Sequence, residues 1–115
     1  MKYFCICFLF LLVLSCNKIS EKRRAELWSM VRSNNVDSII VATMEIQKGK
    51  DSSMINAILY KADDPRITHR PFQKGMSVYQ VKMTALKQII NLDPPKKITY
   101  QVDTSIINFY INSLK

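Results

Sequence analysis

The hydrophobic pattern separates the first fifteen residues from the rest of the chain. An unbroken apolar run from Phe4 to Leu14 follows the positive charge of Lys2, and the small residue Ser15 comes directly after it. Secretory signal peptides have apolar cores of about 7–15 residues, whereas a membrane-spanning helix needs about 20. The run therefore predicts a cleaved signal peptide over residues 1–15, in preference to a transmembrane anchor.

Two amphipathic segments open the remaining chain. Residues 20–33 place a serine before an acidic residue and then repeat apolar side chains along one side, which is typical of a capped helix. Residues 37–47 fit either a helical apolar row or the alternation of a half-buried strand. Asp37 as a cap and Gly49 as a left-handed helix end favour the helix. The inward stripe predicted for the first segment consists of Leu27, Trp28 and Val31.

Three more helical segments are predicted downstream. The first runs from Asp51 to about Lys61 and is followed by a loop over residues 62–76. Ser77 opens the strongest helical pattern, in which Lys82 falls on the polar side, and Asp93-Pro94-Pro95 stops it. After the extended stretch KKITYQV, an aspartate, Asp103, can cap a last helix.

The order of these segments is similar to that of proteins built from helical repeats. A helix, a glycine turn, an Asp-capped helix ending in AILYKADDPRI and a helix containing KMTALKQI together resemble HEAT-type helical repeats, over roughly residues 35–92. In such repeats an aspartate and a following arginine tie successive units together, and Asp64 and Arg66 match those positions. Ala42 and Ala85 match positions where small residues let paired helices approach closely. The insertion RITHRPFQKG departs from the pattern.

The fold expected from these patterns is all-α. About five helices form two HEAT-like helical hairpins, and a C-terminal helix completes the domain. The 100 residues left after removal of residues 1–15 suit one small domain.

The end of the apolar run carries a second resemblance. Val13-Leu14-Ser15-Cys16 resembles the lipobox of bacterial lipoproteins, in which a cysteine follows an aliphatic residue and a small one. The resemblance implies cleavage before Cys16, a diacylglycerol on its thiol and a third acyl chain on its amine. Asn17 is not the aspartate of the inner-membrane retention signal of enteric bacteria, which favours the outer membrane. An ordinary secreted protein cleaved nearby is the alternative.

The expected organisation is therefore a signal peptide over residues 1–15, a lipidated tether over residues 16–19 and a single domain over residues 20–115. Two or more acyl signals anchor a protein stably, whereas one chain alone binds reversibly. We therefore expect a persistent attachment to a bacterial membrane of the cell envelope, through the lipid on Cys16.

Cysteine use and charge narrow the possible chemistry. Cys5 and Cys7 lie in the segment to be removed and Cys16 would be blocked, so disulfides, thiol catalysis and cysteine zinc sites are not expected.

The chain carries a formal charge of +8. A basic domain can bind anionic lipid, lipopolysaccharide or an acidic protein. The basic residues are scattered, however, as on an ordinary solvated surface, and no motif indicates a nucleic acid partner.

Residues with catalytic potential gather only in the predicted loop. The single histidine, His69, follows Asp63, Asp64 and Arg66, but an exposed loop histidine is the simpler interpretation. No Ser/His/Asp spacing, HExxH motif or glycine-rich phosphate loop occurs in the sequence. We therefore expect no enzymatic activity, no cofactor and no metal.

Binding is expected at the same loop, because loops carry binding residues more often than packed helices do. The favoured hypothesis is a small envelope lipoprotein that docks a protein partner. Its candidate contact residues are Arg66, His69, Arg70 and Phe72. The alternative is a lipid-anchored basic domain that binds anionic lipid or glycan, whose affinity would fall steeply with salt.

Overall fold

The structure, a computed structural model, describes residues 19–115, and the signal peptide and Cys16 lie outside these residues. The described chain forms five α-helices and one short 3-10 helix, and its only β-type pairing is an isolated antiparallel bridge between Ile67 and Ser77. The prediction of an all-α fold is confirmed. The helices are α2 (Glu21–Arg32), α3 (Val36–Gly49), η1 (Ser52–Met54), α4 (Ile55–Leu59), α5 (Val78–Ile90) and α6 (Thr104–Ser113).

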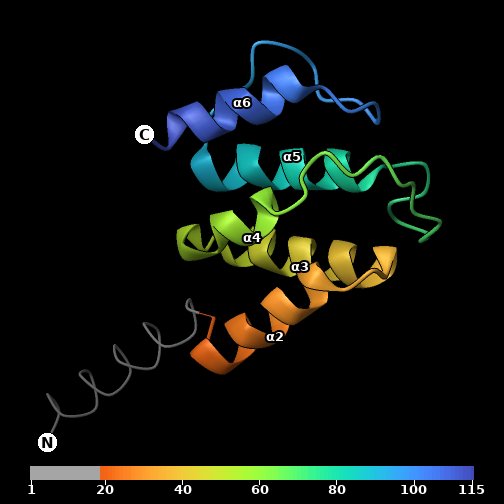
Figure 1. Ribbon diagram of the computed structural model, residues 1–115, viewed down its shortest axis with the longest axis vertical. Helices are drawn as coiled ribbons and strands as arrows, with labels where there is room; N and C mark the ends of the chain where they lie inside the picture. The colour runs from red at the N-terminus through yellow and green to blue at the C-terminus, as the bar shows by residue number, and fades with distance from the viewer. Residues whose placement is uncertain (1–18) are drawn as a thin grey trace, which may run out of the picture.

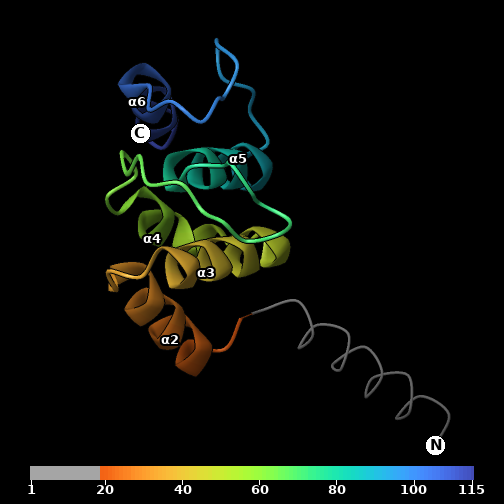
Figure 2. The same cartoon turned by 90° about the vertical axis from the view of Figure 1, so that its right-hand side faces the viewer.

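The helices stack in chain order (Figures 1 and 2). One helical hairpin is formed by α2 and α3 and a second by α4 and α5, and α6 packs on the outer side of α5. The long connection between α4 and α5 lies at one edge of the stack, whereas α2 begins at the opposite edge (Figure 1). Within residues 19–115, none of the helices has both the length and the apolar character that crossing a membrane requires.

Side-chain caps fix most of the helix starts. Ser20, Ser77 and Asp103 accept hydrogen bonds from backbone N–H groups in the first turns of α2, α5 and α6, as the sequence predicts. Residues 37–47 are helical, within α3. The cap of α3 is Asn35 and not Asp37, because the helix already begins at Val36 and leaves Asp37 in its first turn.

The end of α3 also differs from the prediction. Gly49 remains helical and the left-handed residue is Lys50, whose φ is 48°. The side chain of Ile19 lies against Gly49, so that a Cβ placed on this glycine would stand 3.4 Å from Cδ1 of Ile19. The glycine thus serves as a contact surface for the chain that leads into α2, and the turn comes one residue later.

The helix predicted from residue 51 to residue 61 is shorter than expected. Asp51 accepts hydrogen bonds from the backbone N–H and the hydroxyl of Ser53, which tightens the start into the 3-10 turn η1. At the other end α4 stops at Leu59, because Tyr60 is extended and Lys61 is left-handed with a φ of 46°. The hydrogen bonds of Asp51 therefore shorten the helix at its start, and the change of backbone conformation at residues 60–61 ends it.

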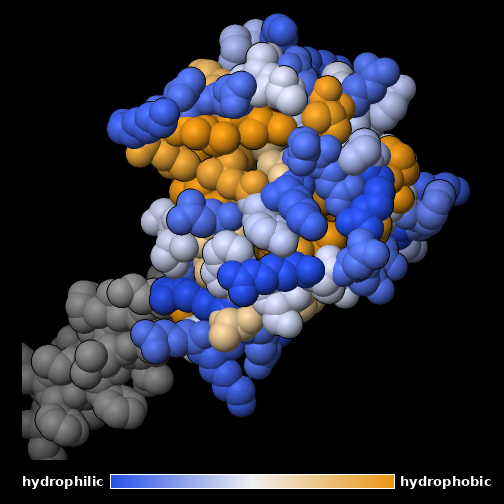
Figure 3. Space-filling view, viewed as in Figure 1, coloured by the Kyte–Doolittle hydropathy of each residue, from blue (hydrophilic) through white to orange (hydrophobic). Residues whose placement is uncertain are grey.

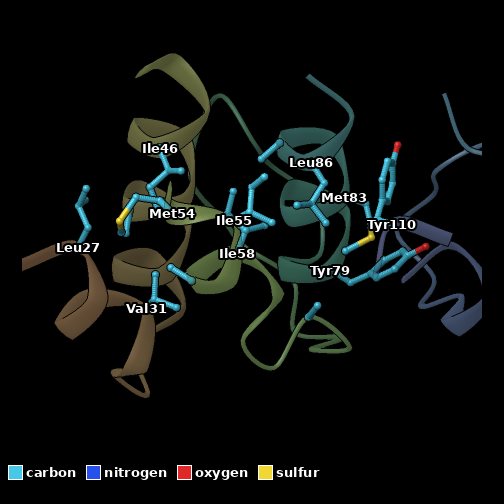
Figure 4. Packing of buried hydrophobic residues seen from close by; sticks show 14 of the residues in the cluster. Leu27, Val31, Ile46, Met54, Ile55, Ile58, Tyr79, Met83, Leu86 and Tyr110 are labelled. Carbon is cyan, nitrogen blue, oxygen red and sulfur yellow. The ribbon is translucent and has the colours of Figure 1, made fainter. Parts of the chain in front are cut away.

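The main hydrophobic core runs through the stack (Figure 4), and a second, smaller cluster lies between α3 and α5 and consists of Ile39, Ile40, Val78 and Val81. Leu27 and Val31 of α2 are buried, as predicted, whereas Trp28 is only partly buried beneath the guanidinium of Arg32, 4.6 Å from the ring centroid. Ala42 of α3 and Ala85 of α5 are fully buried. These small residues belong to the two helices that pack most extensively on each other, as expected for closely approaching helices.

Two buried tyrosines connect α6 to the rest of the core. Tyr79 of α5 and Tyr110 of α6 are both inaccessible to solvent, and Figure 4 shows them side by side. The hydroxyl of Tyr110 donates to the carbonyl oxygen of Leu92 at 2.9 Å. Burial, followed by the negative charge of Asp93, raises the pKa of Tyr110 to about 12. The C-terminal helix is thus part of the core and not an appendage.

Candidate functional site

The insertion between the two halves of the stack is held by an aspartate–arginine pair. The carboxylate of Asp64 accepts three contacts from the Arg66 guanidinium, the shortest at 2.7 Å from Nη2. It also accepts from the backbone N–H of Arg66 at 3.0 Å. The remaining guanidinium nitrogen of Arg66 donates to the carbonyl oxygen of Asn34 at 2.9 Å. Arg66 therefore ties the insertion to the turn between α2 and α3.

The electrostatics of Asp64 reflect this engagement. Burial alone would raise its pKa, but hydrogen bonds from the side chain and backbone of Arg66 outweigh that effect and hold the pKa below its usual value. The pKa of Arg66 is raised by the same carboxylate. Because the guanidinium of Arg66 is committed to Asp64 and Asn34, we assign Arg66 to bracing the loop, and its replacement is expected to affect folding as well as binding.

Backbone hydrogen bonds brace both arms of the insertion. The N–H groups of Val78 and Tyr79 donate to the carbonyl oxygens of Arg66 and Asp64, each at 2.9 Å, and Thr68 N–H donates to Met76 at 2.9 Å. Gly75 adopts a φ of 84° between these arms, a backbone conformation that favours glycine. We call residues 66–75 the recognition loop. Its base is anchored to the start of α5, and only its tip stands away from the fold.

A shallow cleft lies beside the recognition loop. His69 and Arg70 line it from the loop, and Asn35 and Asp37 line it from the start of α3, around a volume of about 690 Å³. The hydroxyl of Thr68 is 3.4 Å from Oδ1 of Asp37, which joins the two walls. Two of the predicted contact residues therefore face α3 across a shallow, water-accessible hollow with both polar and apolar walls.

Phe72 is the most exposed large apolar residue of the described chain. Its side chain is 94% accessible at the tip of the recognition loop, whereas Leu92, Ile111 and Leu114 at the ends of α5 and α6 are 38–45% accessible. Figure 3 shows apolar side chains gathered over the region of α5 and α6. The molecule thus has a broad, partly covered apolar surface on the upper helices and one fully displayed aromatic ring on the loop.

Lys82 is the residue that the sequence pattern misplaces. It is 1% exposed, although the helical pattern put it on the polar side of α5. Its ammonium donates to the carbonyl oxygen of Tyr60, and the residue lines a partly open pocket of about 160 Å³ together with Asp64 and Arg66. Burial lowers the pKa of Lys82 to about 8, against the opposing charges of Asp64 and Asp63. The sequence did contain a signal for this burial: Lys82 lies four residues from both Val78 and Leu86, which are buried, so the three residues share one face of α5.

No group of three or more His, Cys, Asp or Glu side chains within residues 19–115 could hold a metal ion. Compared with known proteins, the chain matches no family model, no curated protein and no solved structure.

Proposed function

We propose that this chain is a small lipoprotein of a bacterial cell envelope, anchored to a membrane through lipid on Cys16, whose helical domain docks another protein through the recognition loop. The proposal is supported chiefly by one observation: Phe72 is 94% exposed on a loop whose base is hydrogen-bonded to α5 and to the α2–α3 turn. An exposed aromatic ring on a braced loop loses little conformational freedom on binding, which favours its use as an anchor.

The neighbours of Phe72 suit a protein surface. His69 and Arg70 place polar and cationic groups around the cleft beside the loop. Aromatic and arginine side chains are enriched at interface centres, where a ring fills a pocket and charged groups surround it. Phe72 is therefore assigned the role of apolar anchor, and His69 and Arg70 provide the polar surroundings that set orientation.

The membrane attachment is supported by the sequence Val13-Leu14-Ser15-Cys16, which lies outside the described residues. It is tested by the intact mass of the protein extracted from membranes, with Cys16→Ala as the comparison. We expect the wild-type chain to begin at Cys16 and to carry acyl mass. We expect the variant to be neither cleaved there nor acylated. An unmodified wild-type chain would overturn the anchor.

Docking is tested by photo-crosslinking in cells that express the full-length chain. A benzoylphenylalanine replaces Phe72 in one variant and Tyr100 in another, since Tyr100 is also an exposed aromatic residue, at 55%, in the segment before α6. We expect a defined protein adduct from position 72 that is absent from position 100. Equal adducts from both positions, or none from position 72, would contradict the proposal.

The same partner provides a quantitative prediction. Phe72→Ala is expected to weaken binding at least about tenfold, which corresponds to about 1.4 kcal/mol, because a central aromatic anchor contributes a large part of the affinity. Its circular dichroism and unfolding midpoint should match the wild type, because a ring this exposed stabilises little. Tyr100→Ala serves as the matched control and should leave the affinity unchanged.

A further inference from the structure

The start of the described chain is fixed on the end of α3. Ile19 lies against Gly49, with Cδ1 at 3.4 Å and Cγ1 at 3.5 Å from the position of a Cβ on that glycine, and it also packs against the core. Three peptide links separate Ile19 from Cys16. At 3.8 Å per link, Cys16 is at most about 11 Å from Ile19, measured between Cα atoms. A lipid on Cys16 would therefore bring the end of α3 to the membrane surface.

Three lysines surround this point of attachment. Lys22 lies in the first turn of α2, Lys48 in the last turn of α3 and Lys50 directly after it, and all three are exposed. Within residues 19–115 none of them takes part in an ion pair. We call Lys22, Lys48 and Lys50 the tether-side lysines.

The other charges at this edge mostly neutralise one another. Arg23 donates to Glu45 at 2.7 Å, and Arg24 donates to Asp51 at 3.2 Å. The hydrogen bond from Arg23 lowers the pKa of Glu45, which keeps this pair ionised. Arg23 also donates to Glu26 at 2.7 Å, so this one arginine faces two acids, and Glu21 forms none of these pairs among the described residues. The second acid on Arg23 and Glu21 together offset two of the three tether-side lysines. A net positive charge of one remains beside the tether, and it is carried by the tether-side lysines.

From these contacts we propose that the tether-side lysines rest on the anionic phosphate headgroups of the membrane that carries the anchor. The inference rests on the proposed lipid attachment and adds an orientation to it. The edge where α2 begins would face the bilayer, whereas the recognition loop lies at the opposite edge of the stack (Figure 1). Attraction between exposed charges and an anionic surface acts within about a Debye length, about 8–10 Å at moderate salt, which is comparable with the reach of the tether between Cys16 and Ile19. Phe72 would then point away from the membrane.

The test is lysine footprinting of the full-length, acylated protein in vesicles. The protein is reconstituted in phosphatidylcholine vesicles with or without phosphatidylglycerol, lysines are acetylated, and each site is quantified by mass spectrometry. We expect labelling of the tether-side lysines to fall at least about threefold in the anionic vesicles and to recover near 1 M salt, where the Debye length is about 3 Å. Lys61, Lys74 and Lys97, which are exposed and form no ion pair within the described chain, should label equally in both vesicles.

Matched variants separate orientation from general charge. With Lys22, Lys48 and Lys50 all replaced by glutamine, we expect the vesicle-dependent protection of backbone amides at the start of α2 and the end of α3 to disappear in hydrogen exchange. With Lys61, Lys74 and Lys97 replaced by glutamine, that protection should persist. Equal labelling of the tether-side lysines in both vesicles, or protection of the control lysines instead, would overturn the inference. The intact mass of the same preparation reports the acyl chains, so failure of the anchor is distinguished from failure of the orientation.

Discussion

Replacing Asp64 with alanine is expected to lower the free energy of unfolding by about 2–3 kcal/mol. Its carboxylate accepts the side-chain and backbone hydrogen bonds of Arg66, and its negative charge faces the buried ammonium of Lys82. Charge-assisted hydrogen bonds contribute about 1.5–3 kcal/mol, and partial exposure of Arg66 reduces their share. Loss of the carboxylate would leave Lys82 buried without the acid that acts on it most strongly, which adds to the cost.

The measurement is urea unfolding followed by circular dichroism, with the midpoint and slope fitted together. Asp93→Ala is the matched control, because the Asp93 side chain is 85% exposed and its only ion pair in the described chain is a 3.5 Å contact with Lys87. The control should change stability by no more than about 0.5 kcal/mol. If Asp64→Ala were equally mild, the pair with Arg66 would not brace the insertion.

A second large effect is expected in the pH dependence of stability, and it comes from Lys82. Burial lowers the pKa of Lys82 from 10.5 to about 8. Between these values the unfolded chain holds a proton on Lys82 that the folded chain has released, so the unfolded state binds more protons and stability rises with pH. From pH 7.5 to pH 9.5 the gain amounts to about 2 kcal/mol.

The experiment compares wild type with Lys82→Met over this pH range, using urea unfolding at each pH. Methionine keeps an unbranched chain of similar length but cannot titrate, so the rise should be absent from the variant. Lys87→Met, on the exposed side of the same helix, should keep the wild-type rise. The range stops short of the pH at which Tyr110, with a folded pKa near 12, begins to act in the opposite direction. The same rise in wild type and Lys82→Met would show that Lys82 is not the titrating group.

The local pattern of the sequence was sufficient for the helices and most of their starts. Apolar side chains spaced three to four residues apart lie on one face of a helix. The caps are equally local, because the side-chain oxygens of Ser20, Ser77 and Asp103 accept from backbone N–H groups two or three residues later. These are interactions between near neighbours. The same locality explains why residues 62–76 were correctly expected as a loop, since Pro65, Pro71 and Gly75 interrupt the apolar pattern.

The candidate site was predicted only in part. The sequence singled out Phe72, and the structure displays it at the tip of the recognition loop. It also singled out Arg66, His69 and Arg70 as one set, whereas the structure separates them: Arg66 is bonded to Asp64 and Asn34, and the other two line the cleft. The local sequence around a loop arginine is the same whether its guanidinium contacts a partner or its own chain. The sequence therefore could not distinguish Arg66, which braces the loop, from His69 and Arg70, which line the cleft.

The sequence by itself determined the all-helical class, the order of the helices, most of the caps and the position of the loop, because each depends on residues a few positions apart. Tertiary structure alone decided that α4 ends at Leu59, that Lys82 is buried and that Arg66 braces the loop. Lys82 meets Tyr60 across 22 residues, and Arg66 meets Asn34 across 32. Contacts at such separations depend on which helix faces lie together, and this is set by packing of the whole core, which no local spacing encodes.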